Sequence, residues 1–188
     1  FRGQTFSGGW TEGEFRVQTI NGLKVTETVY QSKTVSVYRA TRQDDKKSVL
    51  LKILKNVLPS STQAATLRRE YDILSSRPFK GAPAVFSLDH HEDSIYMVLE
   101  NIHGVPLADL QKKERFTVDQ VLNIGLQLTE ILGEIHASNI CYLNLSPRSI
   151  FINTQSDKLH LIDFSLAITA SDHIPEPADN NYSQGDLF

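Results

Sequence analysis

The stretch that decides the fold of this chain is Ile140–Ala167. It reads ICYLNLSPRSIFIN over residues 140–153 and HLIDFSLA over residues 160–167. A polar loop comes first, and two short apolar runs joined by a polar turn follow it, which is the pattern of a β-hairpin. The second run ends in Asp163 and Phe164, so the sequence predicts a carboxylate directly after a strand.

Upstream of this stretch, short apolar runs with alternating polarity predict five antiparallel strands. The turn residues between them are charged or polar, as in the stretch Gln43–Lys47. The expected strands are Lys24–Tyr30, Thr34–Ala40, Ser48–Leu54, Pro83–Asp89 and Ser94–Glu100.

Two helices are expected, and both have capping-box spacing at their start. Ser60 and Gln63 begin the first helix, which follows the third strand. Thr117 and Gln120 begin the second, which extends from Val118 to about Ala137. The second helix has an apolar stripe at helical spacing. The stripe consists of Val121, Ile124, Leu128, Ile131, Leu132 and Ile135.

The order of these elements, together with the Ile140–Ala167 stretch, resembles a protein kinase, whose motifs are HRDLxxxN and DFG. The resemblance implies an α+β, two-lobed fold that is truncated. It would have a five-stranded antiparallel N-lobe sheet with one helix, and then a partial, mostly α-helical C-lobe. The expected boundaries are a lead-in segment at 1–22, the N-lobe at 23–102, and a partial C-lobe at 103–188 that ends in the activation segment.

The loop of this chain departs from the family motif at its reactive positions. Tyr142, Leu143 and Asn144 stand where the family has His, Arg and Asp, while Ser146 and Ser149 replace the usual Lys and Asn. The degenerate base, Asn144, can orient a hydroxyl group but cannot accept its proton. A serine supplies neither the missing cation nor an amide oxygen for a metal ion. The resemblance therefore implies an impaired catalytic site.

Three charged residues of the family remain. Lys52 ends the sequence VLLK, which resembles the VAIK of kinases, where the lysine contacts phosphates and pairs with a helical glutamate. Glu70 follows 18 residues later on the first helix and would be the partner of Lys52. The alternative interpretation is that Glu70 lies at the edge of the apolar stripe of that helix and reaches solvent. Asp163 is the expected Mg²⁺ ligand.

The resemblance also implies a nucleotide pocket. Leu99 would be the gatekeeper, and the adenine partners would be the carbonyl of Glu100 and the amide of Ile102. The walls of the pocket would be Val37, Leu50 and Phe151. The family's glycine-rich loop is missing, because Tyr30, Ser32 and Val35 occupy the three glycine positions. Side chains there hinder the close approach of backbone to phosphate.

Composition limits the function classes. A formal net charge of −3 argues against a broad nucleic-acid-binding surface. No apolar run approaches the ~20 residues that span a bilayer. A single cysteine, Cys141, excludes an internal disulfide and suits the cytoplasm. The chain begins with Phe1, and we expect it to be a piece of a longer protein.

The leading hypothesis is a pseudokinase: a regulatory, kinase-like domain for signal transduction that binds ATP with Mg²⁺. Its partners would be a protein or the adjoining signalling domains of a longer chain. The segments LRREYDIL and ILGEIHASNI resemble the N-terminal kinase-like domains of large bacterial signalling proteins of the serine/threonine kinase type. Two alternatives remain open: an atypical active serine/threonine kinase, and a docking scaffold that binds no nucleotide.

Overall fold

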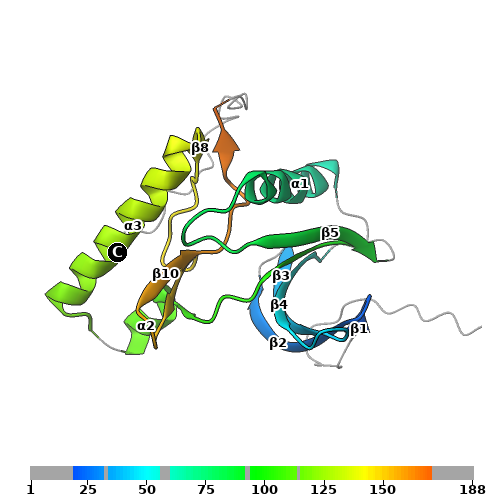
Figure 1. Cartoon of the computed structure of the whole chain (residues 1–188), viewed down its shortest axis with the longest axis horizontal. Coiled ribbons are helices and arrows are strands. Elements are labelled where there is room, and N and C mark those ends of the chain that lie inside the picture. The colour runs from blue at the N-terminus through cyan, green and yellow to red at the C-terminus, as the bar shows by residue number, and fades with distance from the viewer. Residues whose placement is uncertain (1–18, 32–33, 56–59, 92–93, 114, 171–188) are drawn as a thin grey trace, which may run out of the picture.

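The computed structural model of the chain has a curled sheet on one side and two helices on the other, with a β-hairpin between them (Figure 1). The helix α1 lies along the sheet, beside β5 (Figure 1). The structure describes residues 19–31, 34–55, 60–91, 94–113 and 115–170. Most of the predicted lead-in segment, the glycine-loop position Ser32 and the tail 171–188 lie outside the described residues.

The sheet is antiparallel and, within the described residues, has the strand order β1-β2-β3-β4-β6-β5. All five predicted strands are confirmed, with ends that differ by up to two residues. They are β2 (Leu23–Gln31), β3 (Val35–Arg42), β4 (Ser48–Leu54), β5 (Val85–His91) and β6 (Ser94–Glu100).

A sixth strand, β1 (Thr19–Ile20), extends this sheet at one edge, so the prediction of five strands was incomplete. The turn between β1 and β2 is Asn21-Gly22, and both residues have positive φ, 44° and 80°. An Asn-Gly pair with two positive φ angles is the favoured two-residue hairpin connection. The sequence therefore contained the signal for this strand.

The two predicted helices are confirmed as α1 (Ser61–Ser76) and α3 (Val118–Ala137), and each begins with the expected capping box. A short helix, α2 (Leu107–Lys113), lies where only a connecting segment was expected. One stripe residue of α3 was placed wrongly: Val121 is 55% exposed, whereas Ile131 and Ile135 are buried. The stripe packs against the core from Ile124 onward.

The predicted hairpin is also confirmed, as β9 (Ile150–Asn153) and β10 (Lys158–Leu161). The strand β7 (Val105–Pro106) pairs with β9. A further pair joins β8 (Ile140–Cys141) to β11 (Ile168–Thr169). The β8–β11 pair brings the two ends of the Ile140–Ala167 stretch together, so the loop after β8 and the turn after β10 are held close to each other.

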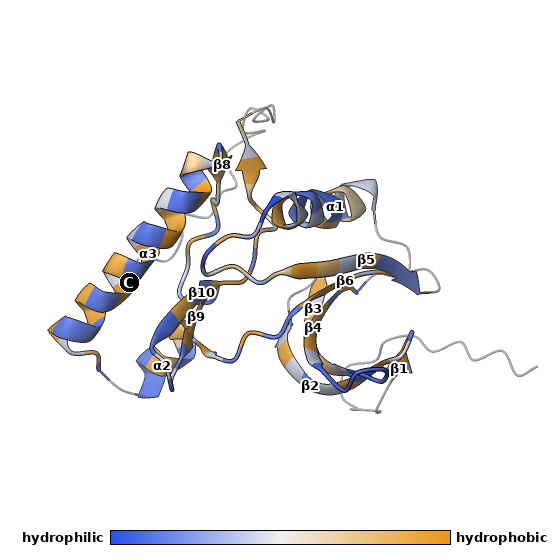
Figure 2. Ribbon diagram, in the orientation of Figure 1, coloured by the Kyte–Doolittle hydropathy of each residue, from blue (hydrophilic) through white to orange (hydrophobic). Residues whose placement is uncertain are grey.

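The period-two geometry of strands divides the sheet core into two faces. On β4, Val49, Leu51 and Ile53 belong to one buried cluster, together with Tyr96 and Val98 of β6. The alternate residues Leu50 and Leu54 belong to the main cluster, which also includes residues of α1, α3 and β9. Lys52 alternates with Leu50 and Leu54, so it lies on the face that meets α1. Figure 2 shows hydrophobic residues in the sheet and also alternating with hydrophilic ones along α3.

In the described part of the chain, none of the helices combines the length and the hydrophobicity that a membrane span requires.

Gly81 lies in the segment between α1 and β5, close to Ile131 of α3, and its carbonyl accepts a hydrogen bond from the amide of Leu161 in β10. We expect this position to tolerate alanine poorly. Its φ is +72°, and an added Cβ would lie 2.4 Å from Cδ1 of the buried Ile131. Gly22 is the matched control, since its φ is +80° and no atom lies within 4 Å of its Cβ position. Urea denaturation should show that both alanine variants lose about 1–2 kcal/mol for the left-handed backbone.

Gly81→Ala should lose about 1–3 kcal/mol more, because of overpacking against Ile131. Equal losses for the two variants would contradict the proposed contact between Gly81 and α3.

Candidate functional site

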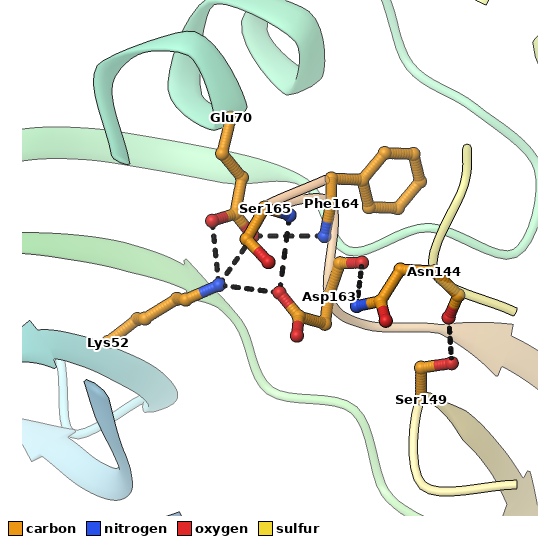
Figure 3. A network of polar contacts seen from close by, with 7 residues as sticks. All are labelled: Lys52, Glu70, Asn144, Ser149, Asp163, Phe164 and Ser165. Atoms are coloured by element: carbon orange, nitrogen blue, oxygen red, sulfur yellow. Dashed lines mark hydrogen bonds and ion pairs between the residues drawn. The ribbon is translucent and has the colours of Figure 1, made fainter. Parts of the chain in front are cut away.

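The centre of the site is an ion-paired triad contributed by three parts of the fold. Lys52 belongs to β4, Glu70 to α1, and Asp163 follows β10. The ammonium of Lys52 lies 2.8 and 2.6 Å from the two carboxylate oxygens of Glu70 and 2.9 Å from Oδ1 of Asp163 (Figure 3). One cation therefore bridges two carboxylates.

Burial makes this pairing obligatory. Lys52 is 4% exposed and Glu70 is 1% exposed, so the alternative of a solvent-exposed Glu70 is excluded. An isolated charge at such a position is very costly, whereas a paired and hydrogen-bonded one is tolerated. With two carboxylates and one ammonium in their ionised forms, the triad has a net charge of −1.

The charges of the triad shift the pKa of each member. Burial alone would lower the pKa of Lys52, but Glu70 and Asp163 outweigh it and hold this pKa above its ordinary value. Burial, reinforced by the charge of Asp163, raises the pKa of Glu70. Burial alone would also raise the pKa of Asp163, yet the charge and hydrogen bond of Lys52 hold it below its ordinary value. Asp163 is therefore the ionised, outward-facing carboxylate of the triad.

Backbone groups hold the turn after β10 against α1. The amide of Phe164 donates to Oε1 of Glu70 at 3.1 Å, and the amide of Ser165 donates to Oδ1 of Asp163 at 3.2 Å. Although Ser165 replaces the glycine of the family motif, the turn around Asp163 is well formed.

Aromatic packing around Phe164 supports the same turn. Phe164 is fully buried. Its ring meets Tyr142 edge-to-face, with centroids 4.9 Å apart, and stacks on Phe79 at 6.5 Å. Burial raises the pKa of the Tyr142 phenol well above its ordinary value, so it stays protonated. Tyr142, which stands at the family's histidine position, thus has a packing role here.

The degenerate loop is closed by hydrogen bonds of its own. The side-chain amide of Asn144 donates to the backbone carbonyl of Asp163 at 3.2 Å. The hydroxyl of Ser149 lies 2.6 Å from the carbonyl of Asn144 and 3.0 Å from that of Ser146, and it accepts from the amide of Ser146 at 3.1 Å. Ser149 is 4% exposed. Its hydroxyl therefore serves the loop rather than a ligand.

A cavity of about 480 Å³ lies beside the triad. It is lined by nine of the residues that were predicted as catalytic or nucleotide-binding. They are Val37, Leu50, Lys52, Glu70, Leu99, Asn144, Ser146, Ser149 and Asp163.

Three predicted pocket residues do not line this cavity. Ile102 and Phe151 are buried in the main core cluster. Glu100 is exposed, and it is bound to the segment before β5: its amide donates to the carbonyl of Ala84 at 2.7 Å, and its carboxylate accepts from the amide of Ala84 at 3.1 Å. The roles of these three residues toward an adenine remain predictions.

The structure adds lining residues that the sequence interpretation missed. The α1 face that also holds Glu70 contributes Thr62, Gln63, Thr66 and Leu67. The loop between β8 and β9 contributes Arg148. Thr66 and Leu67 lie four and three residues before Glu70, so helical spacing was a usable signal for these two. Tyr30 and Val35, at two of the family's glycine positions, also line the cavity, so side chains extend into the space that glycines would leave open.

The side chains at the site do not by themselves complete the coordination of a metal ion, so a bound ligand would have to supply the other oxygen atoms. Within the described residues, no group of three His, Cys, Asp or Glu side chains could hold a metal ion. Asp163 has a side chain that is 32% exposed, and its carboxylate accepts from the Lys52 ammonium and from the Ser165 amide through Oδ1. Its Oδ2 can bind Mg²⁺, which commonly takes one or two carboxylates together with substrate phosphates.

Comparison with known proteins assigns the family. The sequence model described as the protein kinase domain matches residues 24–182. An Aurora kinase of Yarrowia lipolytica is 25% identical over 161 residues, which cover 83% of this chain and 42% of that kinase. A probable serine/threonine-protein kinase of Dictyostelium discoideum is 30% identical over 70% of this chain and 29% of its own length. The serine/threonine-protein kinase ULK3 of Homo sapiens is 24% identical, covering 79% and 32% respectively.

The chain belongs to the protein kinase domain family, as its motifs and its α+β fold indicated. It spans less than half the length of these three relatives. The relatives are eukaryotic, so the bacterial type stays a prediction.

Removing Lys52 should leave Glu70 as a buried, unpaired carboxylate. We expect Lys52→Met to lose about 3–5 kcal/mol of unfolding free energy at neutral pH. Without the cation, the pKa of Glu70 rises further above its unfolded value of 4.5. The folded state then binds the extra proton, so stability falls as pH rises above 4.5. The deficit relative to wild type should be smaller at pH 5 than at pH 8.

Chemical denaturation across this pH range in metal-free buffer tests the expectation. The control is Lys52→Met combined with Glu70→Gln, in which the part of the added pH dependence that comes from Glu70 should disappear, leaving only the part from Asp163, which also loses its cation. A deficit that does not change with pH would show that Glu70 is not the group left unpaired.

Proposed function

We propose that this chain is a kinase-like regulatory domain, a pseudokinase that binds ATP with Mg²⁺ and transfers phosphate poorly. One observation carries the proposal: the Lys52–Glu70–Asp163 triad is assembled beside a cavity, while Asn144, an amide, stands at the position of the catalytic base. The residues for holding a nucleotide are kept, and those for transferring its phosphate are changed.

The cavity supports nucleotide binding. Its volume of about 480 Å³ is typical of a small-molecule site. Val37, Leu50 and Leu99 offer an apolar wall for a base, and Lys52 and Asp163 lie at the polar end. Bound ATP with Mg²⁺ would supply the phosphoryl group and the metal charge that kinases use. Of the chain's own residues, Lys52 would bind phosphate oxygens and Asp163 the metal ion.

The loop argues against efficient transfer. Asn144 donates its amide to the Asp163 carbonyl and has no carboxylate to accept a proton. The Ser149 hydroxyl is occupied by loop backbone, so it is a weak second-metal ligand. Losing a general base alone costs about 10²–10⁴ in rate. The role that remains is a regulatory one, toward a protein partner or adjoining signalling domains in the cytoplasm.

Binding of ATP is tested by thermal unfolding with and without ATP, each with and without Mg²⁺, on wild type and Lys52→Ala. A ligand at 100 times its dissociation constant adds about 2.7 kcal/mol of stability. We expect a stabilisation in wild type that is lost in Lys52→Ala. No stabilisation of wild type at millimolar ATP would overturn the proposal in favour of a nucleotide-free docking scaffold.

Phosphate transfer is tested by restoring the family's loop residues. We expect wild type to transfer no measurable phosphate to generic substrates or to itself. The triple variant Asn144→Asp, Ser146→Lys and Ser149→Asn should gain about 10²–10⁴ in rate over that background, with Asp163→Ala in the same variant as the inactive control. Mg²⁺-dependent transfer by wild type that is abolished by Asp163→Ala would instead support an atypical active kinase.

A further inference from the structure

The charged side chains that line the cavity differ in whether they are ion-paired. Within the described residues, its cationic side chains are Lys52 and Arg148, and its carboxylates are Glu70 and Asp163. Lys52 is bound to both carboxylates at 2.6–2.9 Å. Its charge is therefore already more than balanced before any ligand enters the cavity.

A nucleotide polyphosphate would meet a net charge of −1 from the triad alone. At contact distances in a partly enclosed site, like charges repel by several kcal/mol. A Mg²⁺ ion on Asp163 offsets part of this repulsion. The last phosphate, farthest from Lys52, still requires a positive group on the loop side of the cavity, and Ser146 provides none.

Arg148 is placed to supply that charge. It lies two residues after Ser146 on the loop in which Asn144 contacts the Asp163 carbonyl, and it lines the same cavity. Arg148 makes no hydrogen bond or ion pair with any residue that the structure describes, and it is exposed. A guanidinium is permanently charged and presents a planar fork of donors that matches a phosphate.

The competing use of Arg148 is a structural one, toward α2. Asp109 accepts a hydrogen bond from Lys112 at 2.8 Å. This bond lowers the pKa of Asp109, and the charge of Arg148 contributes the smallest part of the shift. Because Lys112 already holds Asp109, the fold does not require Arg148 there.

We propose that Arg148 binds the terminal phosphate of a nucleoside triphosphate in this cavity, replacing the cation that is absent at Ser146. The inference rests on the proposed function. A base against Val37, Leu50 and Leu99, with its first phosphates at Lys52, brings only the last phosphate of a triphosphate to the loop. Arg148 would therefore make the site prefer a triphosphate to a diphosphate.

The test is calorimetric titration of the chain with Mg²⁺–ATP and with Mg²⁺–ADP. Wild type is compared with Arg148→Gln, Arg148→Lys and Arg115→Gln. Arg115 is the matched control, since it is exposed and does not line the cavity. Its substitution removes one positive charge without touching the site.

We expect Arg148→Gln to weaken ATP binding by about 10- to 100-fold, the worth of a charged hydrogen bond, and to leave ADP binding nearly unchanged. The ATP affinity of Arg148→Lys should fall between those of wild type and Arg148→Gln, because lysine keeps the positive charge and loses the planar fork of donors. Arg115→Gln should behave as wild type. The readout is the ratio of the two dissociation constants, which a merely structural role would not move.

Three results overturn the inference in distinguishable ways. If wild type binds both nucleotides and Arg148→Gln weakens them equally or not at all, Arg148 has no role at the terminal phosphate and the proposed function stands. If wild type binds neither nucleotide, the proposed function and this inference fall together. A lower melting temperature of Arg148→Gln and Asp109→Asn, with an unchanged ATP-to-ADP ratio, would assign Arg148 to α2 instead.

Discussion

The buried ammonium of Lys52 is the constraint on which the rest of this structure depends. Lys52, on the inner face of β4, is only 4% exposed, so the fold must bring carboxylates to its charge. Glu70 arrives from α1 and Asp163 from the turn after β10. One cation thus ties the sheet, the helix and the second half of the chain together. The Phe164 amide, which donates to Glu70, adds a backbone contact to the same junction.

This dependence separates two roles that kinases combine. The triad has a structural reason to persist, since losing one member strands the charge of another. The loop residues Asn144, Ser146 and Ser149 have no such constraint, because a serine hydroxyl and an amide satisfy the loop's own backbone groups. A chain under weak pressure for catalysis can therefore change its loop and keep its triad. Survival of Lys52 and Asp163 alone is not evidence of phosphate transfer.

Electrostatics gives the cavity its character. Two carboxylates around one ammonium leave a negative triad beside a space large enough for a nucleotide. Any phosphate ligand then needs positive charge from elsewhere. In this chain the candidates are a metal ion that Asp163 would hold and the guanidinium of Arg148, and both residues line the cavity. The same arithmetic disfavours binding of phosphate without a metal ion.

The sequence by itself determined the strands β2 to β6, the helices α1 and α3 with their capping boxes, and the β9–β10 hairpin, because local alternation, helical spacing and cap residues act over a few positions. It also indicated the Lys52–Glu70 pair, through the family's spacing. The Asn21-Gly22 turn was a readable signal for the strand β1, which the predicted five-stranded sheet did not include. Only the tertiary structure decided that Val121 is exposed, that Ile102 and Phe151 lie in the main core cluster, and that Glu100 is bound to Ala84. Those outcomes depend on how separate elements pack, and no local pattern in the chain records which residues end up between them.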